Sequence, residues 1–305
     1  GTHYYHSHMD GMQSAKGMRG AFIVKKKPEN DPWTGMYDEE KLVILSDEWQ
    51  DPDVCLKLEG AMAGNDVCSD IDYASVNGQW AIGQYQDFDK KYPYPLIDVE
   101  KGKCYRMRLM MMASNAENYI FSIAGHSMKL IALDGEDVVP IDVSEINMHI
   151  GERADVIVCA NQEPGYYPIE LHYDYACTMS PHGGPGGLPP FIPPGFHEVS
   201  SCRFYSFLHY TGEKEWFYGP PTSDKGTGGG KDPKPVAGVP FDLTRPADWK
   251  KTKMMNKPSW LKDKPDYSYT VTLGLNGPLY SKPTDLPLTK GRWYMVRSTR
   301  SLTHT

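Results

Sequence analysis

Short apolar runs that are rich in β-branched and aromatic residues recur along the chain, with Gly, Asn, Asp or Pro between them. Runs of this kind are typical of β-strands that are joined by turns. Tyr, Pro and Gly are plentiful, at 20, 25 and 29 of the 305 residues, and this composition also favours strands over helices. We therefore expect a mainly β protein.

The expected strands form two groups. Residues 1–8 and 21–24 predict two strands around a loop. Further strands are expected at residues 41–45, 105–109, 119–123, 129–133, 155–158, 167–171 and 204–210. Short strands at this spacing predict a sandwich of two sheets. Met110, Met111 and Met112 alternate in direction along such a strand, so we interpret them as core residues and not as copper(I) ligands.

The length of the chain limits the number of domains, and its charge and apolar runs limit the kinds of partner. A chain of 305 residues suffices for two ordinary domains. The net charge of -7 and the scattered basic residues argue against nucleic acid as a partner. No apolar run approaches the roughly 18 residues of a membrane-spanning helix, so no membrane span is expected.

Composition also divides the chain. The polar segment 28–37 predicts a domain boundary, and a new series of strands begins after it. From residue 213 to about 258 the chain is rich in Lys, Gly and Pro and offers little apolar periodicity, which is typical of a linker. Alternating residues resume at 267–273, so a further domain is expected to begin there.

Six cysteines occur without a C-x-x-C pair: Cys55, Cys68, Cys104, Cys159, Cys177 and Cys202. Disulfides and buried thiols both remain open, and the even number at wide spacing favours an oxidising compartment. Cys177 and Cys202 flank a Pro/Gly-rich loop and are the most natural pair.

The sharpest local feature is the run His3-Tyr4-Tyr5-His6-Ser7-His8. On a strand, His6 and His8 face the same way, about 6.6 Å apart along the backbone, because each residue rises about 3.3 Å. That spacing suits two neighbouring metals with one imidazole each. Copper, zinc and iron all accept imidazole, so the pattern alone does not name the metal. An ordinary polar strand face is the alternative.

The run continues through Gln13 to Gly17-Met18-Arg19-Gly20-Ala21-Phe22-Ile23-Val24. Taken together, residues 1–24 resemble the second copper-binding motif of the multicopper oxidases, the family of laccases, ascorbate oxidase and ferroxidases. The resemblance implies that His6 and His8 each bind one copper of the coupled binuclear pair. It gives His3 no ligand role.

The resemblance extends through residues 76–78, 105–109, 123–126, 132–135 and 151–156, and it is closest to laccase-like members. It implies cupredoxin-like Greek-key β-sandwich domains. Residues 1–27 would be the C-terminal end of a first cupredoxin domain, 38–212 a second domain, 213–262 a linker and 263–305 the start of a third. His126 lies at a turn, and we expect it to be a structural hydrogen-bonding residue.

Near the C-terminus, residues 286–297 resemble the strand pair that leads into the family's third copper motif. This alignment implies that His304 is a ligand of the blue mononuclear copper. Thr305 stands where the family usually has Pro, and a terminal surface histidine is the alternative reading.

The resemblance implies a laccase-like, copper-dependent oxidoreductase with a blue mononuclear copper and a trinuclear cluster. It would take single electrons from a small-molecule reducing substrate, here expected to be phenolic, and reduce dioxygen to water. These 305 residues lack the family's first H-x-H motif, most of its third motif and its final H-C-H motif, so we expect this piece to be inactive alone and activity to belong to a longer parent. That parent is expected to be secreted, in line with the oxidising compartment that the cysteines favour. A ferroxidase and a non-catalytic cupredoxin-derived secreted binding protein are the alternatives, whereas a copper nitrite reductase fits the layout poorly.

Overall fold

The structure is a computed structural model that describes residues 1–8, 13–14, 16–48, 73–83, 94–113, 118–173, 177–179, 197–199, 202–212, 237–242, 248 and 252–255. The chain divides into two compact units, Gly1–Asn256 and Lys257–Thr305, and all described residues belong to the first. The described elements are β1 (Thr2–His6), β2 (Arg19–Ile23), the 3₁₀ helix η1 (Pro28–Asn30), β3 (Glu39–Glu48), β4 (Tyr73–Val76), β5 (Gln79–Trp80), β6 (Ile82–Gly83), β7 (Leu96–Val99), β8 (Cys104–Met111), β9 (Asn118–Ile123), β10 (Met128–Leu133), β11 (Glu136–His149), β12 (Arg153–Cys159), β13 (Tyr166–Tyr173), β14 (Cys177–Met179), β15 (His197–Val199), β16 (Cys202–Tyr210) and β17 (Val239–Asp242).

A mainly β architecture is confirmed, and each strand expected between residues 1 and 210 coincides with an observed one, whereas those expected beyond residue 262 lie outside the described residues. From β3 onward the expected runs become strands because their apolar side chains enter a common core, to which β3, β8, β9, β10, β12, β13 and β16 all contribute. The three consecutive methionines, Met110 to Met112, are buried, as their interpretation as core residues requires. Within the described residues, no helix has the length and apolar character needed to cross a membrane.

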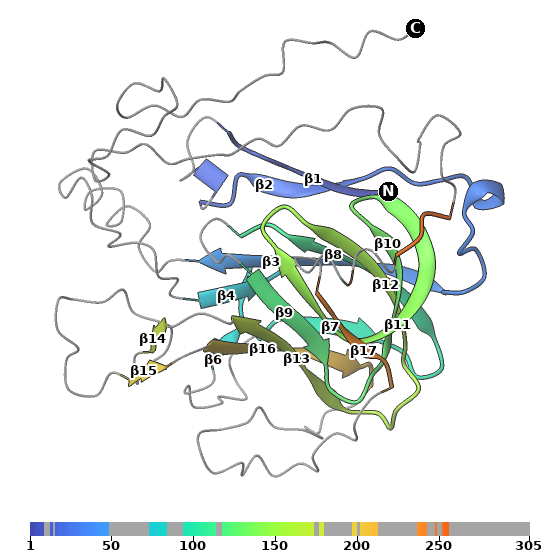
Figure 1. The fold of residues 1–305 in the computed structure, drawn as a ribbon. Coiled ribbons are helices and arrows are strands. Elements are labelled where there is room, and N and C mark those ends of the chain that lie inside the picture. The colour runs from blue at the N-terminus through green and yellow to red at the C-terminus, as the bar shows by residue number, and fades with distance from the viewer. Residues whose placement is uncertain are drawn as a thin grey trace, which may run out of the picture. The chain divides into compact units, whose positions relative to one another are not determined.

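The long strand β11 joins the two halves of the fold. In the described part of the chain, 13 strands form one hydrogen-bonded sheet with the central order β5-β4-β3-β8-β12-β10-β11-β9-β13-β16-β6. β11 pairs with β10 through Val143 and with β9 from Glu145 onward, so it passes from one half to the other. Figure 1 shows the strong curvature of β11, which lets the sheet fold over on its own apolar face.

Two hairpins turn on Asn-Gly and Asp-Gly pairs. Asn77 and Gly78 connect β4 to β5 with φ values of 53° and 79°, and Asp134 and Gly135 connect β10 to β11 with φ values of 49° and 93°. Both turns need two consecutive residues with positive φ, which Asn or Asp followed by Gly adopts at low cost. These pairs set the register next to each turn, and in the β10–β11 pair the register then shifts between Leu130 and Ala132.

One strand lies inside the segment expected to be a linker. β17 pairs in parallel with β11, and its Phe241 is buried in the main core. Most of the rest of that segment and the expected third domain at 263–305 lie outside the described residues, so the domain boundaries stay a prediction.

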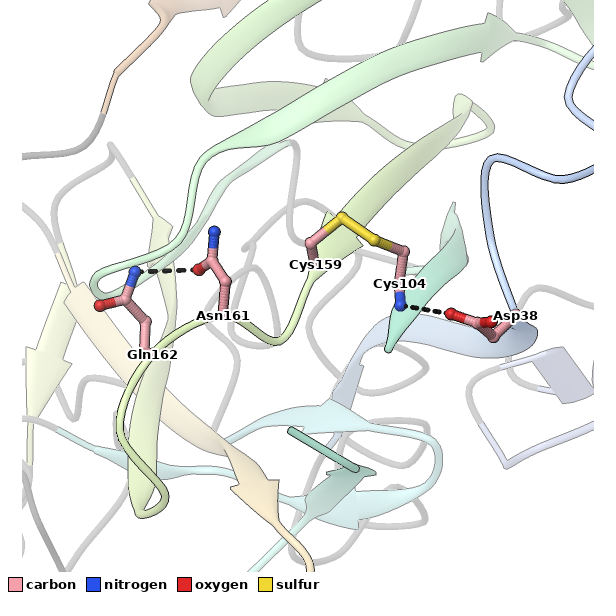
Figure 2. Close-up of a disulfide and its surroundings, with 5 residues drawn as sticks. All are labelled: Asp38, Cys104, Cys159, Asn161 and Gln162. Atoms are coloured by element: carbon pink, nitrogen blue, oxygen red, sulfur yellow. Dashed lines mark hydrogen bonds between the residues drawn. A yellow bond between two sulfur atoms is a disulfide. The ribbon is translucent and has the colours of Figure 1, made fainter. Parts of the chain in front are cut away.

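A disulfide joins two neighbouring strands. Cys104 and Cys159 lie directly opposite each other on β8 and β12 and are bonded through their sulfurs (Figure 2). The Cys104 amide donates a hydrogen bond to the Asp38 carboxylate at 2.8 Å, which ties the segment before β3 to the same point. Cys202 is also disulfide-bonded. Its expected pairing with Cys177 stays a prediction, because the Cys177 side chain lies outside the described set.

His126 is buried and hydrogen-bonded on both ring nitrogens. Nδ1 lies 2.8 Å from the Ala124 carbonyl oxygen, and Nε2 lies 2.8 Å from the Tyr210 hydroxyl. A carbonyl oxygen only accepts, so Nδ1 carries the proton and Nε2 accepts from Tyr210. The expected structural role of His126 is confirmed. Burial lowers its pKa below the ordinary value, because the charged ring would lose contact with water.

This pKa shift predicts a pH dependence of stability. Near pH 6.5 the unfolded chain gains a proton at His126 that the folded chain resists, so the free energy of unfolding should fall as the pH drops below that value. Replacing His126 with Gln should flatten the fall in urea denaturation measured between pH 7 and pH 5. An equally steep fall in His126→Gln would contradict this assignment.

Candidate metal centre

The candidate ligands lie on the antiparallel hairpin of β1 and β2. Thr2 is paired with Ile23, Tyr4 with Ala21 and His6 with Arg19. Side chains alternate along a strand, so Thr2, Tyr4 and His6 share one face. The ring centroids of His6 and His8 are 5.7 Å apart, and those of Tyr4 and His6 are 5.6 Å apart. His6 and His8 thus lie side by side, both exposed, as their spacing in the sequence suggested.

The His6 ring has one nitrogen held by the backbone. Its Nδ1 lies 2.9 Å from the Ser7 carbonyl oxygen, and an oxygen of this kind can only accept. Nδ1 is therefore the protonated nitrogen, and the lone pair is left on Nε2. A ligand histidine usually donates its second ring N–H to a carbonyl or carboxylate in this manner, so His6 fits a metal that binds through Nε2.

The residue between the two histidines anchors the end of the hairpin. Ser7 donates its amide hydrogen to the Met18 carbonyl at 2.9 Å, and the Met18 amide donates to the Gln13 carbonyl at 2.9 Å. The Ser7 hydroxyl also donates to the Gln13 side-chain oxygen. Gln13 belongs to the run that resembles a copper-binding motif, and these contacts show its role in the fold, which is to hold Ser7, the residue before His8.

The opposite face of the hairpin is apolar and exposed. Tyr5, Met18, Phe22 and Val24 are at least half exposed there. His3 also lies on this face and packs against Gly135, where an added Cβ would be 2.7 Å from the ring. His3 is therefore turned away from His6 and His8, in agreement with its exclusion from the ligand set.

The structure brings together only two of the three histidines that are expected to bind copper. Within the described residues, no group of three or more His, Cys, Asp or Glu side chains is placed to hold a metal ion. His6 and His8 form a pair, and His304 lies outside the described residues. The assignment of all three as copper ligands stays a prediction.

A buried ionic cluster attaches the hairpin to the sandwich. The Asp155 carboxylate, on β12, accepts hydrogen bonds from Arg106 at 2.5 and 2.9 Å and from Arg108 at 2.9 Å, both on β8. Thr2 on β1 donates its hydroxyl to Asp155 at 2.5 Å and accepts from Arg108 at 2.8 Å. Arg153 reaches the Thr2 carbonyl at 3.2 Å. The strand that bears the histidines is thus hydrogen-bonded directly to two strands of the sandwich.

Further carboxylates balance the two guanidinium groups. Arg108 contacts Glu40 at 2.5 Å, and Arg106 contacts Asp31 at 3.4 Å. Lys25 lies 3.1 Å from Glu40. Although burial alone would raise the pKa of Glu40, the hydrogen bonds from Arg108 and Lys25 lower it to about 2. Glu40 is therefore ionised at neutral pH and supplies a full counter-charge.

Two arginines within an apolar strand are the feature of the sequence that points to this cluster. Arg106 and Arg108 alternate with Tyr105, Met107 and Leu109 on a strand whose other residues are apolar. A charged side chain that is buried in such a strand needs a partner, but a single sequence does not tell which of 39 acidic residues supplies it.

The cluster yields a prediction about stability. Asp155→Asn leaves two buried guanidinium groups short of one negative charge, so unfolding should become easier by about 3–5 kcal/mol. The matched control is Asp142→Asn, because Asp142 pairs with Lys129 on the surface, where such a change costs less than about 1 kcal/mol. Urea denaturation of both variants measures the difference, and equal stabilities would refute the role of Asp155.

Known proteins that are similar to this chain include multicopper oxidases. A family model described as multicopper oxidase matches residues 39–184. Laccase-3 of Thanatephorus cucumeris is 33% identical over 174 residues, which are 55% of this chain and 29% of that protein. Laccase-4 of Trametes villosa is 32% identical over 186 residues, which are 60% of this chain and 33% of that protein. The matches thus span about a third of the length of these relatives.

Among solved structures, Fet3p, a multicopper oxidase that functions in iron import, superimposes with a TM-score of 0.51 and 21% sequence identity. The match covers 71% of this chain and 35% of that one. At this identity the likeness concerns the fold, and it confirms the cupredoxin-type β-sandwich that the sequence resemblance implied.

Proposed function

The chain belongs to the multicopper oxidase family, and from this membership we propose that it is part of a laccase-like copper oxidase. The family implies a copper-dependent oxidoreductase with dioxygen as acceptor. The proposed reaction removes one electron at a time from a phenol-type substrate. Four such electrons and four protons convert one dioxygen molecule into two molecules of water. The laccases among the relatives support the choice of substrate.

The observation that carries the proposal is the close approach of two exposed imidazoles, those of His6 and His8. His6 is the last residue of β1 and His8 lies just beyond it, with ring centroids 5.7 Å apart, and the Ser7 carbonyl leaves Nε2 of His6 available. We propose that each ring holds one copper of a binuclear pair and that His304 holds the blue copper. Copper supplies reversible one-electron chemistry.

The residues of this chain position the ligands. The Ser7 carbonyl sets the orientation of the His6 ring, and Gln13 holds the Ser7 side chain. Thr2 and Asp155 fix the other end of the same strand to β12. Ligands that are held rigidly by neighbouring hydrogen bonds bind metal with less reorganisation, so these contacts serve the proposed site.

We also propose that the protein is secreted. The Cys104–Cys159 bond and the disulfide at Cys202 support this, because disulfides persist mainly in oxidising compartments.

The exposed apolar face with Tyr5, Met18, Phe22 and Val24 supports the assignment of residues 1–27 to a further cupredoxin domain, whose other strands would cover it.

Copper analysis of the intact protein tests the proposal. His6→Ala and His8→Ala should each lower the copper content by the loss of the binuclear pair and abolish dioxygen uptake with a phenol, while the blue copper absorption remains. His3→Ala is the matched control, because His3 is on the same strand but faces Gly135. Full copper content in all three variants would refute the assignment.

Substrate tests separate the alternatives. Dioxygen uptake with a phenol supports a laccase-like enzyme, uptake with ferrous iron alone supports a ferroxidase, and uptake with neither supports a binding protein. The 305-residue chain by itself is expected to give no uptake after copper loading, and robust turnover would contradict that expectation.

A further inference from the structure

The residue opposite the first candidate ligand is an arginine. His6 and Arg19 are directly paired across the hairpin. Opposed residues of an antiparallel pair project from the same face with Cβ atoms about 4.5–5.5 Å apart. Arg19 therefore emerges from the backbone next to His6, on the face that bears His8 as well.

The guanidinium of Arg19 does not point into solvent but contacts the end of the sandwich. Nη2 lies 2.6 Å from a Glu48 carboxylate oxygen, and Nη1 lies 3.3 Å from the Met112 carbonyl oxygen. The two side chains are 7% and 20% exposed, so water screens this pair only weakly. Glu48 is the last residue of β3, and its carboxylate also accepts a hydrogen bond from the Ser75 hydroxyl on β4 at 2.9 Å.

The pair has an electrostatic consequence for a metal at His6. An uncompensated guanidinium on the strand next to a ligand repels a bound cation, and the repulsion is strong where water is excluded. Glu48 cancels this charge and at the same time holds Arg19 on the sandwich. Imidazole ligands contribute no negative charge of their own, so the balance provided by Glu48 matters more here than it would beside carboxylate ligands.

We propose that Glu48 and Arg19 are positioning residues for the copper pair at His6 and His8, supplied by the contact between the second domain and the hairpin. This inference rests on the proposed function. The second domain then contributes to metal affinity without a ligand of its own. Glu48 neutralises the charge of Arg19, and Arg19 attaches β2 to the sandwich at the residue that is paired with His6.

Copper affinity of the intact protein, measured by competition with a chelator, tests the proposal. Glu48→Gln keeps the shape of the side chain but leaves Arg19 without its counter-charge, so the dissociation constant of the binuclear copper should rise at least about tenfold. Glu170→Gln is the matched control, because Glu170 also pairs with an arginine, Arg203, on other strands. That control should leave the affinity unchanged.

A double variant separates charge from mere destabilisation. Arg19→Gln together with Glu48→Gln removes the uncompensated charge while keeping two groups that can hydrogen-bond, so copper affinity should return most of the way to the wild-type value. A merely structural role predicts no recovery, because the ion pair stays broken. If the double variant binds copper as weakly as Glu48→Gln, the electrostatic inference is wrong.

The outcome can be told apart from a failure of the proposed function. If His6→Ala leaves copper content intact, the metal centre itself is misplaced. If His6→Ala removes copper but Glu48→Gln binds it with wild-type affinity, the centre stands and only the role of Glu48 and Arg19 falls.

Discussion

The charge balance around Asp155 is the constraint on which the placement of the hairpin depends. A buried carboxylate between two guanidinium groups is stable only when every charge has a partner at hydrogen-bond distance. Here the charged groups are Lys25, Arg106 and Arg108 against Asp31, Glu40 and Asp155, so the cluster is neutral as a whole. Because its members come from five segments, satisfying the charges fixes how those segments meet.

A two-stranded hairpin needs such support. In isolation a hairpin of this size is at best marginally stable in water. Here it is held at both ends: Thr2 is bound by the Asp155 cluster, and Arg19 is bound by Glu48. The candidate ligand His6 is the cross-strand partner of Arg19, so it lies at one of the two fixed points and not on a free end.

Sequence reasoning succeeded where local periodicity decides the outcome. Alternation predicted the strands and placed His6 and His8 on one face, and the Asn77-Gly78 and Asp134-Gly135 pairs mark observed hairpin turns. β11 was not anticipated, although it is the longest described strand. Its run of residues contains Pro140 and changes partner midway, so it shows no uniform alternation.

Contacts between distant residues were beyond that reasoning. Thr2 and Asp155 are 153 positions apart, and Arg19 and Glu48 are 29 apart. In one sequence nothing distinguishes these partners from many other polar residues. The bond between Cys104 and Cys159 was missed for the same reason, since it depends on the register of β8 against β12. Likewise, β17 arises within a polar segment because β11 offers an edge for it.

Two neutral groups of charges attach the hairpin to the sandwich, and their neutrality bears on how the proposed metal centre would form. The Asp155 cluster and the pair of Arg19 with Glu48 balance their charges without any metal, so docking of the hairpin does not require copper. Small metal domains behave in the opposite way, because their ligands come together only when the ion binds. In this chain the contacts of Thr2, Ser7 and Arg19 hold the hairpin that carries His6 and His8, whose ring centroids are 5.7 Å apart. Under the proposed function, binding energy that ordering the strand would otherwise cost is available to hold the metal, so the sandwich would contribute to the site without supplying a ligand.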